Sequence, residues 1–366
     1  MGSIRANPHR PIESLDRTAS STRMRDLPQW LPKTPSLLAY MGRIRPHRAG
    51  QAPKTDGMDD APEMARAPIA RGSIMMPPAR VLAAVDFSDA SRIALSCAAR
   101  LTRHCDGELH IVHVPPLLMI APAFELGTAF AAEVYDDLRA FVRATPCAGL
   151  APKCHVVVGE TARVIRDIAT RECCDVIVVG AHGLAADDRH PLGPTTEQLL
   201  REGDIPVLVV PIDWTPPDPA RGDLSGTGPV IAGLDFTSPS IDAASAGARL
   251  AARLHTRLLL VHAVPRPQVT QRWSEEVESM TRQEAAIAHA RIEPLVAALR
   301  DIAPVDVRIE IGGIAATLAH ATEGMPGALL VLGRAAHAQP YGVPGTIASR
   351  VLSHTHAPLL LAAPST

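Results

Sequence analysis

The sequence predicts an α/β protein of two tandem doubly wound, Rossmann-like domains, each a five-stranded, mainly parallel sheet with helices on both faces. Three observations lead to this fold class. Short β-branched apolar runs alternate with helix-like stretches, this pattern occurs twice, and a Pro/Gly/Asp-rich segment separates the two copies. The length of 366 residues exceeds one typical domain and fits two domains with an extension.

An internal repeat sets the expected domain borders. The segment RVLAAVDFSDASRIALSCAARL (80–101) aligns with PVIAGLDFTSPSIDAASAGARL (229–250). The two Asp-Phe pairs, and the histidines of LHIVHV and LLLVHA (His113 and His262), are separated by the same interval. Such self-similarity indicates a duplicated structural unit. We therefore expect one domain over residues 79–212, a linker over 213–227 and a second domain over 228–366.

The elements of the first unit follow from apolar spacing. We expect strands at RVLAAV, ELHIVHV, KCHVVV, DVIVVG and PVLVVP, because continuous β-branched runs are typical of strands buried on both faces of a parallel sheet. Residues 89–104 carry apolar side chains at helical spacing, which predicts one buried stripe of Ile93, Ala94, Cys97, Ala98 and Leu101. In the second unit, Ser238 is expected to cap a helix that begins at Pro239.

Residues 1–78 have a different character from the rest of the chain. They are rich in Pro, Arg, Ser and Gly and show no sustained helical or strand period, which predicts a disordered extension. Within it, DLPQWLPKTPSLLAYMGRIR (26–45) is apolar enough to be a short docking element, and we leave that alternative open.

Charge and hydropathy exclude several classes of partner. The net charge of −2 does not favour nucleic acid as a bulk electrostatic partner. No apolar stretch approaches the roughly 18 residues of a membrane span. The N-terminus lacks the apolar core of a secretory signal, so we expect a cytoplasmic protein.

The six cysteines do not follow the spacing of a metal site. All lie between Cys97 and Cys174, and no two of them form a C-x-x-C pair. We therefore expect reduced thiols and no metal centre.

One loop carries three glycines at the position where such sheets bind ligands. In VVGAHGLAADDRHPLGPTTEQLL (178–200), Gly180 ends the expected fourth strand, Gly183 follows, and Gly193 precedes a helix. Doubly wound sheets bind ligands beyond the carboxyl ends of their strands. Glycines there allow positive φ angles and close approach of backbone amides, and a helix N-terminus favours phosphate. The loop therefore predicts a site for a phosphate-bearing ligand.

Both units resemble the universal stress protein (UspA-like) family, over residues 79–212 and 228–364. The residues that carry the resemblance are V-D-F-S, I-V-H-V, V-G-E-T-A-R-V-I, D-V-I-V-V-G-A-H-G and G-P-T-T-E-Q-L-L. The resemblance implies the adenine nucleotide alpha-hydrolase-like fold. In the ATP-binding branch of this family the signature is Gly-x2-Gly-x9-Gly followed by Ser or Thr, and this loop matches the glycine spacing.

The resemblance also implies a ligand and the residues that hold it. The ligand is ATP or another adenine nucleotide, with Mg²⁺ as a candidate companion. Asp86 and Val114 would face the adenine and ribose, and the phosphate-binding residues would be Gly180, His182, Gly183, Gly193, Thr195 and Thr196. The counterparts in the second unit are Asp235, Gly333, Gly345 and Thr346.

Two departures from the signature bear on affinity. Pro194 stands where the family has Ser or Thr, so an N–H and a hydroxyl are missing, each hydrogen bond to a charged group being worth about 1.5–3 kcal/mol. In the second unit Ala336 replaces the second glycine and the loop is shorter, where a Cβ at positive φ would add strain. The first unit is therefore the better candidate site.

Several of these residues also have a purely structural interpretation. Asp86 and Asp235 could cap the helices that follow them, as Glu160 and Thr161 are expected to do at another helix start. His113 and His262 are expected to be structural histidines, because no nucleophile or acidic partner lies near them in sequence.

The sequence thus favours a non-catalytic stress-response regulatory module that binds an adenine nucleotide in its first unit. A ligand-free scaffold with both pockets degenerate is the alternative, and a slow ATPase is a weaker one. The family resemblance further implies pairing of the two units through the terminal strands at 206–211 and 357–364, with a homodimer as a further level of assembly.

Overall fold

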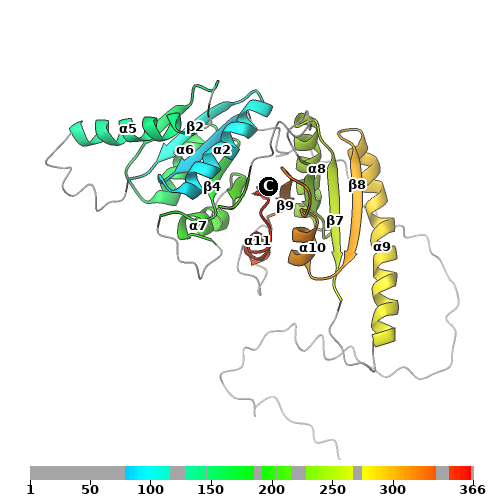
Figure 1. Cartoon of the computed structure of the whole chain (residues 1–366). Coiled ribbons are helices and arrows are strands. Elements are labelled where there is room, and N and C mark those ends of the chain that lie inside the picture. The colour runs from blue at the N-terminus through cyan, green and yellow to red at the C-terminus, as the bar shows by residue number, and fades with distance from the viewer. Residues whose placement is uncertain are drawn as a thin grey trace, which may run out of the picture. The chain divides into compact units, whose positions relative to one another are not determined.

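The computed structural model describes residues 79–115, 128–145, 147, 149–184, 192–202, 204–215, 228–266, 274–334 and 346–363 (Figure 1). The predicted extension (1–78) lies outside the described residues, as does most of the predicted linker (213–227).

The first half alternates strands and helices as predicted. Its strands form one parallel sheet in the order β3-β2-β1-β4-β5. The elements are β1 (Arg80–Val85), α2 (Asp89–His104), β2 (Glu108–His113), α5 (Thr128–Arg143), β3 (Lys153–Val156), α6 (Thr161–Arg171), β4 (Val176–Gly180), α7 (Pro194–Glu202) and β5 (Val207–Val210).

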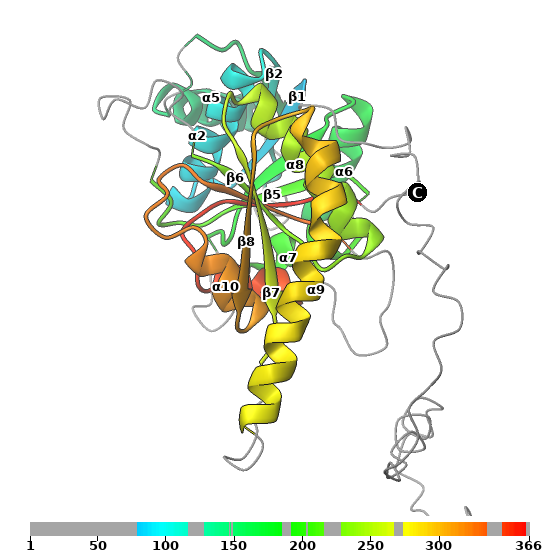
Figure 2. The ribbon, with the colours of Figure 1, turned by 90° about the vertical axis from the view of Figure 1, so that its right-hand side faces the viewer.

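The second half repeats this topology, with the order β8-β7-β6-β9-β10. Its elements are β6 (Val230–Gly233), α8 (Ser238–Arg253), β7 (Leu258–Val264), α9 (Ser274–Arg300), β8 (Val305–Ile311), α10 (Ile314–His320), β9 (Leu329–Leu332), α11 (Thr346–Leu352) and β10 (Leu359–Leu361). Helix α9 runs beside β7 and β8 and extends past their ends (Figure 2). The predicted α/β fold, present twice, is confirmed.

The sheets of the two halves are connected by one pair of strands. β10 pairs with β5 in antiparallel register, with Leu360 opposite Leu208, and the result is a single ten-stranded sheet. All seven residues of the two strands are buried. Strands that would otherwise present unpaired backbone groups therefore cover each other.

Side chains alternate between the two faces of the sheet, as the strand period requires. On β1, Val81 and Ala83 join one core cluster and Leu82 joins the other. The first cluster takes residues from α2, α5, α8 and α9, and the second from α6, α7, α10 and α11. Both faces of the sheet are thus covered by helices, which explains why its inner strands are largely apolar and buried, whereas the edge strands β3 and β8 carry charged residues.

Helix α2 spans the predicted residues, and most of its predicted stripe is buried (Ala94, Cys97, Ala98 and Leu101). The prediction for α8 was wrong by one residue. Thr237 is the N-cap, Ser238 is the first helical residue, and Pro239 the second. The reason is that Thr237 occupies the place of Ser88, the N-cap of α2, and its hydroxyl binds Asp235.

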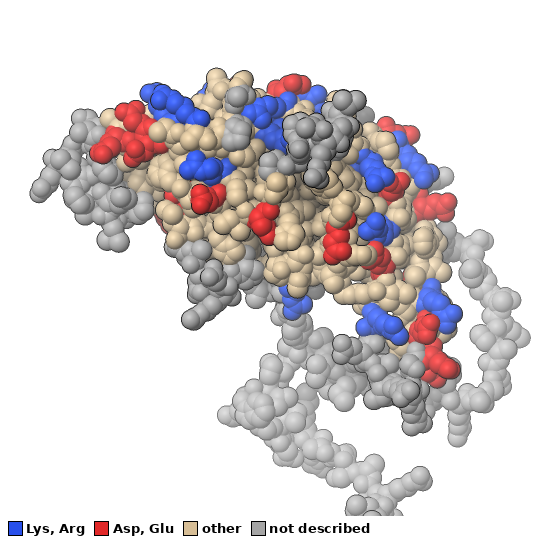
Figure 3. Space-filling view, viewed as in Figure 1, with Lys and Arg blue, Asp and Glu red and all other residues tan. Residues whose placement is uncertain are grey.

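The described surface carries charges of both signs, and the cysteines are free thiols. On the face shown in Figure 3, Lys and Arg are interspersed with Asp and Glu. Among the described residues, no helix combines the length and apolar character needed to cross a membrane. All six cysteines are free thiols; Cys173 is exposed, Cys154 half-buried, and the others are buried.

Candidate functional site

Three segments far apart in sequence meet at the carboxyl edge of the first half's sheet. Asp86 follows β1, Gly180 ends β4, and Gly193 precedes α7. The backbone N–H of Leu184 donates to Oδ2 of Asp86 at 2.8 Å. The N–H of Gly193 donates to the carbonyl of Ala181 at 2.8 Å. The described parts of the glycine loop are therefore tied to β1 and to the start of α7.

Both carboxylate oxygens of Asp86 are occupied by protein donors. Oδ1 accepts from the N–H of Ser88 at 3.1 Å and from its hydroxyl at 2.5 Å, while Oδ2 accepts from Leu184. Partial burial acts to raise the pKa of Asp86, but the hydrogen bonds from Ser88 and Leu184 outweigh it and hold the pKa below its ordinary value. Ser88, not Asp86, is the N-cap of α2, and Asp86 orients it.

Gly180 and Gly183 are needed for close packing and not for backbone conformation. A Cβ on Gly183 would lie 2.3 Å from Oδ2 of Asp86, and one on Gly180 would lie 3.2 Å from the backbone of Ala90. The expectation of positive φ at the loop glycines was wrong, because Gly180, Gly183 and Gly193 all avoid the left-handed region. A Cβ on Gly193 would meet nothing closer than 3.5 Å.

The start of α7 offers backbone N–H donors, but one of its two threonine hydroxyls, that of Thr196, is already hydrogen-bonded within the protein. The hydroxyl of Thr196 is buried and donates to the carbonyl of Gly180 at 2.9 Å, so it anchors α7 to β4. Thr195 is half-buried, and Pro194 is the first helical residue. Among the described residues, no acceptor receives the N–H groups of Thr195 or Thr196, as is usual in a first helical turn.

Val114 and His182 border the same edge. Val114 lies just beyond β2 and packs half-buried against the second core cluster. His182 is half-buried between the first two loop glycines. Sequence analysis placed both at the site, and the fold brings both to the carboxyl edge of the sheet.

A residue that sequence analysis missed sets the backbone next to Asp86. Phe87 adopts φ 68°, in the left-handed region, and its ring lies 4.2 Å from the His113 ring and 5.4 Å from the Phe141 ring. The side chain of His113 is bonded to the carbonyl of Val85 at 2.8 Å. Burial lowers the pKa of His113, which keeps the ring neutral near pH 7.

The second half repeats this strand-end arrangement. Phe236 has φ 63° and lies 4.8 Å from the ring of His262, whose Nδ1 lies 2.7 Å from the carbonyl of Leu234. Both histidines thus make the carbonyl and ring contacts expected of structural histidines. The sequence did carry a signal for the left-handed phenylalanine, because an Asp-Phe pair precedes Ser or Thr in both copies.

The other counterparts in the second half are only partly described. Asp235 binds the N–H of Thr237 at 3.0 Å, and a Cβ on Gly333 would lie 2.2 Å from the carbonyl oxygen of Pro239. Gly345 lies outside the described residues, as does Ala336, and Thr346 is described as the first residue of α11. The described counterparts keep the packing at the strand ends.

Comparison with known protein families gives a match in each half of the chain. The model of the universal stress protein family matches residues 78–211 and 227–363. No curated protein matches the chain.

Solved structures of similar fold are also found. A universal stress protein from Archaeoglobus fulgidus is 16% identical with a TM-score of 0.54, covering 77% of this chain and 97% of its own. A putative universal stress protein from Pseudomonas aeruginosa is 16% identical with a TM-score of 0.51, covering 78% and 94%. A universal stress protein in complex with cAMP is 22% identical over 37% of this chain and 97% of its own, with a TM-score of 0.31.

We predict that Gly183→Ala destabilises the protein by about 1–3 kcal/mol, because the new Cβ displaces the Asp86 carboxylate and breaks its bond to Leu184. Gly193→Ala is the matched control and should change stability by less than about 0.5 kcal/mol. Urea unfolding measures both. Equal losses for the two variants would contradict the assigned clash.

Asp86→Asn should destabilise the protein at pH 7, and this loss should shrink as the pH falls below about 4. A depressed folded pKa means that the stabilisation is complete above the unfolded value of about 3.9 and disappears as pH falls through the folded value. Unfolding free energies of both proteins at pH 7, 5, 4 and 3 test this. A gap between wild type and variant that stays constant over this range would refute it.

Phe87→Ala should cost about 3 kcal/mol through lost ring contacts. Phe87→Gly should be more stable than Phe87→Ala by about 1 kcal/mol, because glycine tolerates φ 68°. In α5 the order should reverse, with Phe141→Gly less stable than Phe141→Ala. Thermal unfolding of the four variants provides the comparison, and the same order at both sites would argue against backbone strain at Phe87.

Proposed function

Because the chain belongs to the universal stress protein family, we propose that it is a non-catalytic, cytoplasmic regulatory module whose first half binds ATP or another adenine nucleotide. Its two working units are residues 79–212 and 228–366. One observation carries this proposal, which is the meeting of Asp86, the glycine loop and the start of α7 at the carboxyl edge of one parallel sheet.

Backbone groups would make most of the phosphate contacts. The N–H groups of Thr195 and Thr196 stand in the first turn of α7, where the helix dipole also favours negative charge. Gly183 brings backbone close to the same edge without a side chain in the way. Mg²⁺, if it accompanies the nucleotide, would offset phosphate charge.

Asp86 would act as a positioning residue. Its oxygens already hold Ser88 and Leu184, so it fixes the loop on which the phosphates would rest. Val114, at the end of β2, would border the adenine. In this arrangement the specificity for adenine comes from shape and backbone contacts at the ends of β1 and β2.

The absence of turnover is supported by the state of the strand-end histidine. His113 is buried, bonded to a carbonyl and packed against Phe87, so it is poorly placed to act as a general base. The second half would serve mainly as the structural partner, since β10 covers β5 within the same chain. Assembly into a homodimer would then use other surfaces.

A ligand-free scaffold is the second candidate function, and a specific observation favours it. Both Asp86 oxygens and the Thr196 hydroxyl are already satisfied by the protein, and Pro194 supplies no N–H. A site with fewer free donors and acceptors binds a nucleotide more weakly.

We expect ATP with Mg²⁺ to raise the melting temperature of the wild type, and Gly183→Val to abolish that shift. The relevant quantity is the nucleotide-induced shift of each variant, because Gly183→Val also lowers the baseline stability. Gly313→Ala is the control that should retain the shift, because Gly313 lies in the second half and a Cβ there meets open space.

Three outcomes decide between the functions. A shift in the wild type and in Gly313→Ala, lost in Gly183→Val, supports nucleotide binding. No shift with ATP, ADP or AMP at millimolar concentration supports the scaffold. Release of phosphate above the rate of the Gly183→Val protein would instead establish an ATPase.

A further inference from the structure

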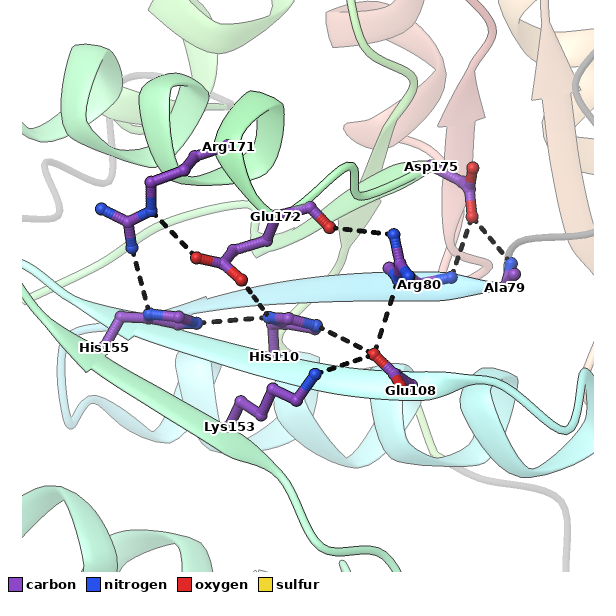
Figure 4. Close-up of polar contacts among 9 residues, drawn as sticks. All are labelled: Ala79, Arg80, Glu108, His110, Lys153, His155, Arg171, Glu172 and Asp175. Carbon is purple, nitrogen blue, oxygen red and sulfur yellow. Dashed lines mark hydrogen bonds and ion pairs between the residues drawn. The ribbon is translucent and has the colours of Figure 1, made fainter.

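Two histidines and a glutamate converge in the first half (Figure 4). They lie near the amino edge of its sheet, whereas the glycine loop follows the carboxyl end of β4. His110 lies on β2, His155 on the edge strand β3, and Glu172 is the C-cap of α6. Nδ1 of His110 is 3.2 Å from Nε2 of His155 and 4.0 Å from Oε2 of Glu172. The three ligand atoms all lie within 4.8 Å of one another.

The buried imidazole of His110 is not explained by the fold. Its side chain is 1% exposed, and its Nε2 makes no hydrogen bond, with the nearest carboxylate oxygen, of Glu108, at 3.6 Å. An unsatisfied buried polar group is normally destabilising. The second half has Leu259 at the same register position and Arg308 in place of His155, so the shared topology requires neither histidine.

We propose that His110, His155 and Glu172 form a binding site for a divalent transition-metal ion of the Zn²⁺ class. Two imidazole nitrogens and one carboxylate oxygen are a donor set that Zn²⁺ prefers. Ligand atoms of a tetrahedral Zn²⁺ site lie about 3.3 Å apart. The two nitrogens already have this separation. The Glu172 oxygen lies 4.0 Å from Nδ1 of His110 and the cluster spans at most 4.8 Å, so this oxygen needs a shift of up to about 1.5 Å.

Neighbouring charged groups orient these ligands. Glu108 faces Nε2 of His110 and is held by Lys153 at 3.1 Å and Arg80 at 3.5 Å (Figure 4). A metal-bound histidine usually donates its other N–H to such a carboxylate. On the other side, Arg171 binds Oε1 of Glu172 at 2.9 Å, which leaves Oε2 to the metal.

Metal binding requires two local changes. Without metal, His155 and His110 are joined by an N–H···N hydrogen bond, and the guanidinium of Arg171 lies 3.5 Å from Nδ1 of His155. Zn²⁺ would displace the proton between the two nitrogens, so that His155 carries its proton on Nδ1. Arg171 must then turn away from Nδ1, and its side chain is 59% exposed and free to do so.

The site is open to solvent on one side. β3 is the last strand of the described sheet, and the Glu172 side chain is 25% exposed. Three protein ligands leave one tetrahedral position for water. The site thus has an entry path and would hold the ion with an exchangeable fourth ligand.

Titration of the chelator-treated full-length chain with Zn²⁺, followed by calorimetry, tests the proposal. We expect one saturable site per chain, and Zn²⁺ should raise the melting temperature. His110→Leu, which copies the second half, should remove the site, and Glu172→Gln should weaken binding at least about tenfold. The visible absorption of bound Co²⁺ gives a second readout of the same ligands.

Matched controls separate this site from other zinc ligands. His320→Asn removes an exposed histidine paired with Glu310, and Cys173→Ser removes the exposed thiol beside Glu172; both should retain the site. Without metal, His110→Leu should melt no lower than the wild type, which shows that it folds. The proposal fails if the wild type shows no saturable binding of Zn²⁺ or Co²⁺ below 0.1 mM, roughly. It also fails if His110→Leu and Glu172→Gln bind the ion as the wild type does.

Discussion

The contact between Gly183 and the carboxylate of Asp86 holds the carboxyl edge of the first half together. It leaves no room for a Cβ, and it lets one aspartate bind the amide of Leu184 with one oxygen and the N-cap Ser88 with the other. Strand β1, helix α2 and the glycine loop are thereby fixed to one another through a single ionised group. The proposed nucleotide site rests on this rigid edge, because weak backbone donors discriminate well only when they are preorganised.

The duplication separates what the fold needs from what one copy has added. Both halves keep the left-handed phenylalanine, the strand-end histidine bonded to a carbonyl, and a glycine packed against the first turn of a helix. The histidine and glutamate cluster occurs in the first half, where the second half has Leu259 and Arg308. The recurring contacts are therefore explained by packing, whereas the cluster found in the first half is not required by the shared fold.

The two proposed sites use opposite edges of the same sheet. The nucleotide site lies where strands end, and the metal site lies near where β2 and β3 begin, at the end of α6. Helix α6 starts near one edge with Glu160 accepting from the amides of Ala162 and Arg163, and it ends at Glu172 near the other. The same helix therefore contributes to both edges of the first half. Strand β5, at the opposite side of this sheet from β3, is covered by β10.

The sequence by itself determined the fold class, the repeat, most strands and helices, and the position of the glycine loop at the carboxyl edge of the first half's sheet. These follow from local apolar periodicity and from glycine positions, which a single chain displays directly. It misjudged the reason for the glycines, because close approach between Gly183 and Asp86 depends on residues nearly a hundred positions apart. It gave no sign of the cluster of His110, His155 and Glu172, since their spacing in sequence follows no metal motif. Only the tertiary structure decided these points, because strand register and the end of α6 bring those side chains to one place.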